Sequence, residues 1–270
     1  MADIQFRTDL YRGTASYYDR FRPGYPPDLV EDLTRRSGAD GTGTLIDLAC
    51  GTGQLAFALH QHFGQTWAVD QEAGMVNLVR AKAQAAGVDS IRPVVSAVED
   101  FDAPPAGFDL AVMGNAFHRV RRSTVAANIL RWLRPGRCLA LAWSEGPWHG
   151  SAPWQQAMAE IMVWWRARLD AAERVPADYE QERAARPDAD VLTAAGFQVD
   201  GRYEFRAVHD WTVEALTGYV YSTSVLAPPV LGRAAAAFEA ELRSQLLSCE
   251  PDGRFRQEVS FAYDLATRPA

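Results

Sequence analysis

The sequence predicts an α/β fold: a doubly wound, mostly parallel sheet of seven strands, the last one antiparallel, with a helical cap inserted after the fifth strand. Two observations favour this class. Short apolar runs rich in β-branched residues alternate with longer segments of helical period, as in parallel strands joined by helical crossovers. The first of these runs also leads through a glycine turn directly into a helix, which is typical of such a crossover unit.

The most informative stretch is TLIDLACGTGQLAFALHQH at residues 44–62, which has the pattern of a strand, a glycine turn and a helix. Gly51 and Gly53 allow positive φ angles and let a ligand approach main-chain N–H groups. A second apolar run ends at Asp70, where a carboxylate can accept both hydroxyls of a ribose. The segment therefore predicts a site for an adenosine-containing cofactor.

The later strands and helices follow in regular order. Gly87 ends one helix, Ser123 is a suitable N-cap for another, and Pro135-Gly136 closes that second helix. We expect strands at 66–70, 91–96, 108–114, 137–143, 197–205 and 258–268, and helices at 75–86, 123–133 and 188–195.

We expect a single domain over residues 1–270, organised in four parts. An N-terminal helical lid at 1–40 precedes a cofactor-binding core at 41–143. The alternation then breaks into an aromatic-rich helical cap at 144–186. The C-terminal half of the sheet, 187–270, carries helices over 211–247 that are interrupted by two prolines.

Composition and charge narrow the classes of function. The 270 residues are 48% hydrophobic, enough for a sizeable core, and the net charge of −7 argues against binding a nucleic-acid backbone. Cys50, Cys138 and Cys249 lack metal-ligand spacing, so we expect reduced thiols and no metal site. No signal peptide and no apolar run of about 18 residues is evident, so we expect a cytoplasmic protein that does not enter a membrane.

The glycine turn leaves two classes of cofactor to compare. Gly51-x-Gly53-x-x-Ala56 also satisfies the loose fingerprint of dinucleotide-binding folds. However, Asp47 precedes the turn at the strand end, where its charge suits a cationic or amine group better than a pyrophosphate. The downstream chain also lacks an evident hydride-transfer site such as a Tyr-x-x-x-Lys pair. Both observations count against a dinucleotide.

The segment Asp47-Leu48-Ala49-Cys50-Gly51-Thr52-Gly53 resembles the first motif of the class I S-adenosylmethionine-dependent methyltransferases, acidic-x-Gly-x-Gly-x-Gly. Ala49 stands where the family usually has its first glycine, which is a mild departure. The resemblance implies S-adenosylmethionine as cofactor and S-adenosylhomocysteine as product. It places Asp47, Ala49, Gly51 and Gly53 among the cofactor-binding residues.

The same resemblance implies further cofactor contacts. Asp70, followed by Gln71, matches the family's acidic ribose ligand, and Met75 matches a residue that packs near the adenine. Val98-Glu99-Asp100-Phe101 resembles the turn that brackets the adenine ring. Because Ala97 replaces the acidic residue often found before that turn, the contact to adenine falls to the backbone of Val98 and Glu99.

Other segments resemble a bacterial small-molecule branch of the family that includes antibiotic-tailoring enzymes of actinomycetes. YYDRFRPGYP at 17–26 is similar to its opening, in which an aromatic residue and an arginine reach over the cofactor's carboxylate end; Tyr18 and Arg22 are the residues implied here. TGYVYSTS at 217–224 and the terminal ATRP are also similar to that branch. Asn115 follows the fourth strand, where the family places residues nearest the methyl donor.

The catalytic candidates follow from the cofactor, whose sulfonium methyl is already activated. The enzyme mainly aligns a nucleophile with the S–CH3 bond, while a hydroxyl acceptor needs a base. His118 is the best candidate base because histidine titrates near neutral pH. Tyr17 and Tyr11 are weaker candidates that would line the pocket or relay a proton, and Phe117 would form a wall that excludes water.

These candidates also have purely structural interpretations. His118 could hydrogen-bond to the backbone, Phe117 could belong to the core, and the tyrosines could seal the sheet. Arg119, Arg121 and Arg122 fit a solvated loop better than a site for an anionic substrate. The tryptophans of the cap could line a cavity or fill the cap's own core.

The acceptor is predicted to be a small molecule. Enzymes that methylate base amines carry an Asn/Asp-Pro-Pro-aromatic tetrad after the fourth strand, and here Ala116 and Phe117 stand at the proline positions. A helical cap also suits a small, enclosed acceptor. We predict N-methylation, with O-methylation as the alternative, in secondary-metabolite or antibiotic biosynthesis, and expect that the cap or C-terminal helices could support a homo-oligomer. Two other classes stay open: a methyltransferase fold that binds the cofactor without methyl transfer, such as a cyclase or sensor, and an NAD(P)-dependent oxidoreductase.

Overall fold

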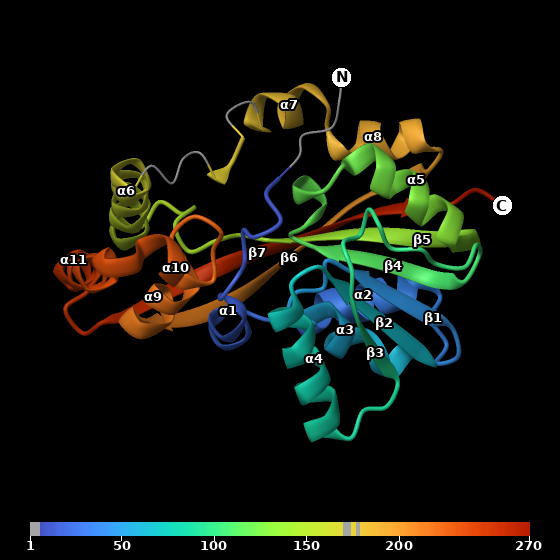
Figure 1. Cartoon of the computed structure of the whole chain (residues 1–270), viewed down its shortest axis with the longest axis horizontal. Helices are drawn as coiled ribbons and strands as arrows, with labels where there is room; N and C mark the ends of the chain where they lie inside the picture. Colours follow the sequence, from blue (N-terminus) through green and yellow to red (C-terminus); the bar gives the residue numbers. More distant parts are fainter. Residues whose placement is uncertain (1–5, 170–173, 177–178) are drawn as a thin grey trace.

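The structure, a computed structural model, describes residues 6–169, 174–176 and 179–270. Its centre is a seven-stranded sheet with the order β3-β2-β1-β4-β5-β7-β6, in which β7 runs antiparallel to both of its neighbours (Figure 1). This confirms the predicted fold class. The strands are β1 (Thr44–Leu48), β2 (Gln65–Asp70), β3 (Ile91–Val95), β4 (Phe108–Gly114), β5 (Leu133–Ser144), β6 (Gln198–Thr212) and β7 (Arg254–Thr267).

The helices fall into two groups in space. Most helices of the first group cover the parallel part of the sheet, whereas the second group gathers at the far end of β6 and β7 (Figure 1). The first group consists of α1 (Ala15–Phe21), α2 (Pro27–Ser37), α3 (Gln54–Leu59), α4 (Ala73–Ala86), α5 (Arg122–Trp132), α7 (Tyr179–Ala185) and α8 (Asp188–Ala195), and the second of α6 (Pro153–Arg168), α9 (Val213–Tyr221), α10 (Pro228–Leu231) and α11 (Ala235–Cys249).

Side-chain alternation along β1 explains how the two faces of the sheet are covered. Ile46 and Leu48 belong to the core under α5 and α8, whereas Leu45 packs with residues of α2 and α3 on the opposite face. Asp47 therefore points toward the α3 side. Because β1 pairs in parallel with both β2 and β4, the carboxyl end of β1 lies at the reversal point of the strand order, where open α/β sheets bind ligands.

The second group of helices forms a separate packing unit, which we call the helical subdomain: α6, α9, α10 and α11 with the ends of β6 and β7 that they cover. Its core is rich in aromatic side chains, including Trp154, Trp165, Trp211 and Tyr219, each at most 4% exposed. These tryptophans mainly fill the subdomain's own core, as one of the two interpretations of the cap predicted.

Several predicted boundaries are wrong. β5 begins at Leu133, β6 extends to Thr212 and β7 begins at Arg254, where the sequence predicted 137, 205 and 258. Ser123 does not cap α5, which begins at Arg122; its hydroxyl instead accepts a hydrogen bond from Arg186. Pro135-Gly136 follows the end of α5 at Trp132 but lies inside β5, where the Gly136 N–H donates to the carbonyl of Arg268. The helical block expected from 211 begins at Val213, because β6 stays paired with β7 through Thr212.

The helices of the predicted lid, and those of the predicted cap, pack against different parts of the molecule. α1 contacts α9 and α4, whereas Leu29 and Leu33 of α2 are fully buried in the core beneath the sheet. Within 144–186, α6 joins the helical subdomain, while Glu182 of α7 contacts Arg122 of α5; residues 170–173 and 177–178 of this segment lie outside the described residues. Among the residues described, no helix has the length and apolar character needed to cross a bilayer.

Candidate functional site

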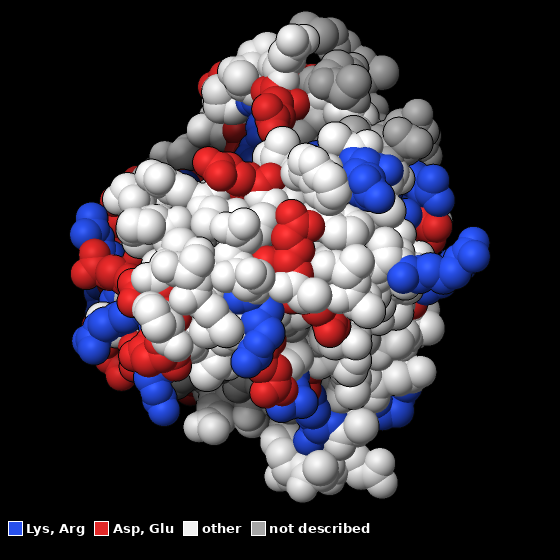
Figure 2. All heavy atoms as spheres, turned by 90° about the vertical axis from the view of Figure 1, so that its left-hand side faces the viewer, with Lys and Arg blue, Asp and Glu red and all other residues white. Residues whose placement is uncertain are grey.

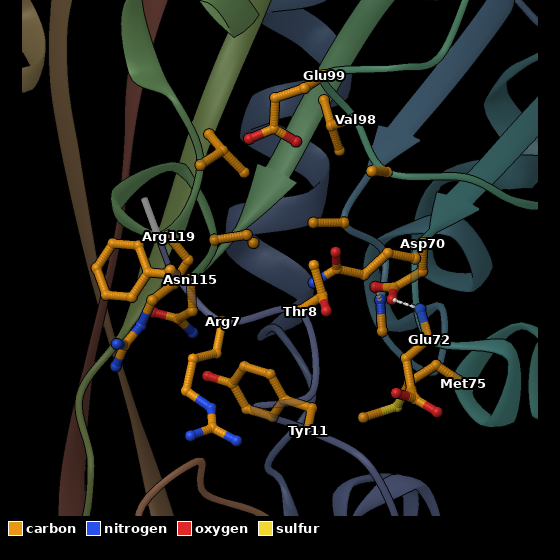
Figure 3. A pocket seen from close by; sticks show the side chains of 18 of the residues that line it. Arg7, Thr8, Tyr11, Asp70, Glu72, Met75, Val98, Glu99, Asn115 and Arg119 are labelled. Carbon is orange, nitrogen blue, oxygen red and sulfur yellow. Dashed lines mark hydrogen bonds between the residues drawn. The ribbon is translucent and has the colours of Figure 1, made fainter. Parts of the chain in front are cut away.

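A pocket opens at the carboxyl ends of β1, β2 and β4, between the sheet and the N-terminal segment (Figure 3). It brings together residues that the sequence analysis selected from distant positions. The predicted site residues that line it are Tyr11, Tyr18, Ala49, Gly51, Asp70, Gln71, Met75, Val98, Glu99 and Asn115.

The glycine turn takes the conformation that its motif predicts. Ala49, Gly51 and Gly53 have φ angles of 51°, 55° and 81°, all in the left-handed region. A β-carbon on Gly53 would lie 3.1 Å from Val79, so a side chain there would be both strained and crowded. Ala49 accepts the strained conformation that glycine adopts freely, at a cost of about 1 kcal/mol. Gly53 itself shapes the turn from behind and does not line the pocket.

Asp70 joins the glycine turn to the end of β2. Its Oδ2 accepts a hydrogen bond from the Gly51 N–H at 2.8 Å, and its Oδ1 accepts one from the Glu72 N–H at 2.8 Å. Burial raises the pKa of Asp70, and these two N–H donors oppose that shift. Each carboxylate oxygen has a second lone pair, so the side chain, which lines the pocket, can still accept hydroxyl donors from a ligand.

Asp47 has a different environment from the one predicted. The side chain is 1% exposed and does not line the pocket; its Oδ2 accepts a 2.9 Å hydrogen bond from the Ala56 N–H in the first turn of α3. Its Oδ1 has no partner among the described residues, and burial raises the pKa of Asp47 to about 8. The structure therefore places Asp47 where it supports the helix, not where it meets a charged cofactor group.

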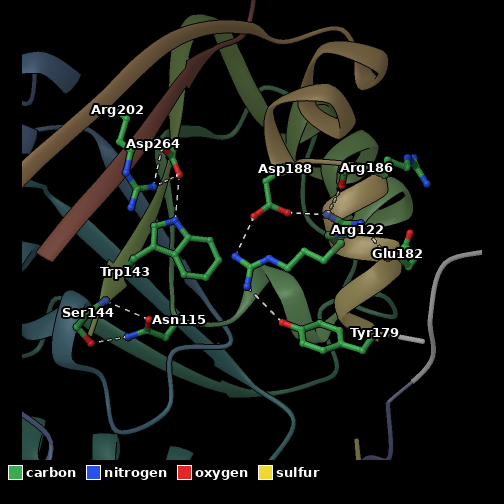
Figure 4. Close-up of polar contacts among 11 residues, drawn as sticks. Asn115, Arg122, Trp143, Ser144, Tyr179, Glu182, Arg186, Asp188, Arg202 and Asp264 are labelled. Carbon is green, nitrogen blue, oxygen red and sulfur yellow. Dashed lines mark hydrogen bonds and ion pairs between the residues drawn. The ribbon is translucent and has the colours of Figure 1, made fainter. Parts of the chain in front are cut away.

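Asn115 is fixed at the other side of the pocket. Its backbone is in the left-handed region, with φ at 50°, and its amide is held twice by Ser144 of β5 (Figure 4). Nδ2 donates to the Ser144 hydroxyl at 2.7 Å, and Oδ1 accepts from the Ser144 N–H at 3.1 Å. Glu99, on the loop after β3, accepts a hydrogen bond from the Arg121 N–H at 2.9 Å. Two loops that border the pocket are thus tied together.

Only some of the N-terminal aromatic residues border the pocket. Tyr11 and Tyr18 line the pocket and pack edge to face, with ring centroids 6.5 Å apart. Arg22 lies behind Tyr18, 4.9 Å from its ring centroid, and donates to Ser222 at 2.7 Å and to the Tyr219 hydroxyl at 3.0 Å. Tyr17 does not line the pocket and packs against Tyr221.

The predicted base also lies away from the main pocket. His118 stacks on Trp143 with ring centroids 5.6 Å apart and borders a smaller cavity beside Tyr179. Burial lowers the pKa of His118 well below its usual value, and the charges of neighbouring arginines lower it further. The reason for selecting it, titration near neutral pH, therefore does not hold. Phe117 is 1% exposed and belongs to the sheet core.

Sequence reasoning missed the N-terminal strip Phe6-Arg7-Thr8 and misjudged the arginines after β4. Arg119 and Arg121 line the pocket, as does this strip. Arg122 is 4% exposed and pairs with Glu182 at 2.9 Å and Asp188 at 2.7 Å, so the interpretation as a solvated loop is wrong for this residue (Figure 4). Only the unusual density of arginine after a buried strand could have pointed to a buried role.

The same strands and turn are matched by a known family. Residues 45–136 match the family model described as "Methyltransferase domain". This region is therefore similar to a methyltransferase domain. It contains β1, the glycine turn, β2, β3 and β4, and therefore most of the pocket's lining.

Relatives of the same description and solved structures of the same fold accompany this match. An uncharacterized methyltransferase of Schizosaccharomyces pombe is 25% identical over 158 residues, which cover 58% of this chain and 58% of the relative. The chain thus matches less than two thirds of that protein's length. A proposed type II methyltransferase of Anaeromyxobacter dehalogenans has the same fold, with a TM-score of 0.66 at 21% identity over 93% of this chain and 100% of that chain. The [4+2]-cyclase SpnF is also similar in fold, with a TM-score of 0.56 at 16% identity over 100% of this chain and 98% of that chain.

Proposed function

We propose that the protein transfers the methyl group of S-adenosylmethionine to a small-molecule acceptor. One observation carries the proposal: the N–H of Gly51 is bonded to the carboxylate of Asp70 within the region similar to a methyltransferase domain, so the turn and the ribose ligand form one wall of the pocket. The cytoplasmic location and the homo-oligomer expected from the sequence are predictions that this geometry leaves open.

The residues present fit the cofactor. Asp70 would accept the ribose hydroxyls, while Met75 and Val98 supply apolar surface for the adenine. The main chain from Ala49 to Gly51 approaches closely enough to line the methionine end, and Tyr18 covers the turn, 3.6 Å from where a β-carbon of Gly51 would lie. Arg22 stacks on Tyr18 and pairs with no carboxylate among the described residues. It does not line the pocket, so its positive charge would act on the cofactor's carboxylate end from behind Tyr18.

When bound, S-adenosylmethionine supplies an activated methyl group on a sulfonium. The protein's part is to position the acceptor and to exclude water. Tyr11 and Asn115 border the space where the acceptor would lie, and Asn115 is held rigid by Ser144. Because His118 lies apart from this space and its pKa is low, it is a poor choice as general base. This favours an acceptor that presents its own lone pair, such as an unprotonated amine, over a hydroxyl.

Surface charge supports a small acceptor. On the face shown in Figure 2, Lys and Arg are interspersed with Asp and Glu among the described residues and do not gather in one basic patch. Together with the net charge of −7, this argues against a nucleic-acid substrate. The similarity of residues 17–26 and 217–224 to antibiotic-tailoring enzymes supports a secondary metabolite as the finer proposal.

The test is methyl transfer itself. The protein is incubated with S-adenosylmethionine and a panel of small amines and hydroxyl compounds, and S-adenosylhomocysteine is quantified. We expect product with at least one amine and none without an acceptor. Tight cofactor binding with no product over a broad panel would instead favour a fold that uses the cofactor without methyl transfer, the class that the fold similarity to the cyclase SpnF keeps open.

A further inference from the structure

Arg119 stands out among the charged residues that line the pocket. It follows β4 and borders the pocket, yet its Nε and Nη1 are buried and have no hydrogen-bond partner among the described residues. Its neighbour Arg122 shows the ordinary solution for a buried guanidinium, with two carboxylates and one main-chain carbonyl as acceptors. Arg119 has no such arrangement in the part of the chain that the structure describes.

Aromatic rings hold Arg119 in place without satisfying its donors. Its Cζ lies 5.0 Å from the ring centroid of Phe6 and 5.6 Å from that of Tyr179. Such contacts orient a guanidinium but accept no N–H hydrogen bond. Burying unpaired donors on a charged group costs free energy, which an anionic ligand with two oxygens would offset.

The position of Arg119 assigns that ligand to the acceptor side of the pocket. Figure 3 shows Arg119 beside Asn115 and opposite Asp70, Glu72 and Met75, which form the wall proposed for the nucleoside. The methionine end of the cofactor belongs to the turn at Gly51 under Tyr18, where Arg22 lies close behind. The cofactor's own carboxylate would therefore lie on a different side of the pocket from Arg119.

We propose that the acceptor carries an oxyanion, a carboxylate or a phosphate ester, which the guanidinium of Arg119 binds. That the anionic molecule is the methyl acceptor rests on the proposed methyl transfer, whereas the anion site itself does not. A guanidinium matches the planar spacing of two oxygens on either group. Arg119 is a specificity-determining residue in this account, because it selects an acid over its neutral analogue.

The experiment separates the anion site from the cofactor site. Calorimetry first measures S-adenosylhomocysteine binding to the full chain. Malonate and inorganic phosphate are then titrated separately into protein with and without S-adenosylhomocysteine, so that the two oxyanion sources are compared directly. Arg119→Met keeps the apolar length of the side chain, Arg119→Lys keeps its charge, and Arg233→Met removes an exposed charge far along the chain as the matched control.

We expect at least one oxyanion to bind the protein loaded with S-adenosylhomocysteine. Its affinity should be at least about tenfold lower for Arg119→Met, intermediate for Arg119→Lys and unchanged for Arg233→Met. S-adenosylhomocysteine affinity should stay unchanged in Arg119→Met, and the thermal midpoint should not fall, because the unpaired buried donors are removed. The proposal is overturned if neither oxyanion binds, if Arg119→Met binds them equally well, or if that variant mainly loses S-adenosylhomocysteine. If the wild type binds no S-adenosylhomocysteine, the proposed function fails, while Arg119-dependent oxyanion binding to the unloaded protein would still support the anion site.

Discussion

The cofactor half of the molecule, residues 41–143, and the helical subdomain differ in how their sequences specify their contacts. In the cofactor half, the decisive contact joins Gly51 to Asp70, which are 19 residues apart. In the helical subdomain, Trp211 donates to Gln257, 46 residues away, and Trp165 donates to Glu241, 76 residues away. The site at the glycine turn could thus be inferred from a local motif, whereas the core of the helical subdomain depends on long-range contacts.

The two regions should differ most in how a substitution in the subdomain core changes the free energy of unfolding and the cofactor affinity. Trp211 is 2% exposed in the subdomain core, and replacing it with Ala should cost about 3–5 kcal/mol of unfolding free energy. Because Trp211 lies outside the cofactor half, S-adenosylhomocysteine affinity below the transition should be unchanged. Chemical denaturation and calorimetry check both parts. Trp164→Ala, at a residue 48% exposed, is the control and should cost far less.

Removing the ribose ligand should affect only the cofactor half. Asp70→Ala deletes the acceptor of the Gly51 and Glu72 N–H groups and, in our account, two ribose contacts. S-adenosylhomocysteine affinity should fall about a hundredfold or more, since hydrogen bonds to charged groups contribute strongly. Titration calorimetry measures this. Asp102→Ala, whose side chain is 96% exposed, should bind normally; equal affinities for the two variants would contradict the assignment.

The buried carboxyl beneath the turn predicts a pH dependence of stability. The folded pKa of Asp47, about 8, lies above its unfolded value, so the native state binds the extra proton between these two values. Stability from this group is full at low pH and is lost as pH rises through the folded pKa, at about 1 kcal/mol per pH unit. Asp47→Asn should remove that slope in denaturation curves from pH 5 to about 8, while the exposed Asp89→Asn should keep it. Parallel slopes in all three proteins would refute the buried titration.

Arg22 connects the two regions. Its carbonyl accepts a hydrogen bond from Gln54 of α3, and its guanidinium donates to Tyr219 and Ser222 at the end of α9. Arg22→Lys keeps the charge but loses the fork of donors. We expect S-adenosylhomocysteine to bind about tenfold more weakly. The exposed Arg20→Lys is the control. Unchanged affinity in Arg22→Lys would show that this residue only joins the two regions.

The smallest effect is expected at the residue that sequence reasoning favoured most as a base. His118→Asn should lower turnover of an acceptor found in the panel by less than about tenfold, below the usual contribution of a general base, with the pH profile unchanged. Tyr11→Phe, inside the pocket, should lower it more. A large loss in His118→Asn with a shifted pH profile would restore the histidine as the base.

Local chemistry could be predicted from the sequence, and tertiary placement could not. The alternation of strands and helices and the turn at Gly51 and Gly53 follow from periodicity and from φ angles that glycine favours. The expected cap at Ser123 failed because α5 begins at Arg122, and the Ser123 hydroxyl accepts a hydrogen bond from the distant Arg186. The low pKa of His118 arises from burial, which no local pattern reports. Arg119 and Phe6 meet across more than a hundred residues, a pairing that only the fold reveals.

The most direct test of the central claim is equilibrium binding to the wild-type protein. Calorimetry would compare S-adenosylhomocysteine with NAD at the same protein concentration, with Asp70→Ala run alongside. The account predicts saturable binding of S-adenosylhomocysteine at one site, no heat from NAD and a strongly weakened isotherm for Asp70→Ala. Saturable binding of NAD by folded protein that gives no heat with S-adenosylhomocysteine would contradict it.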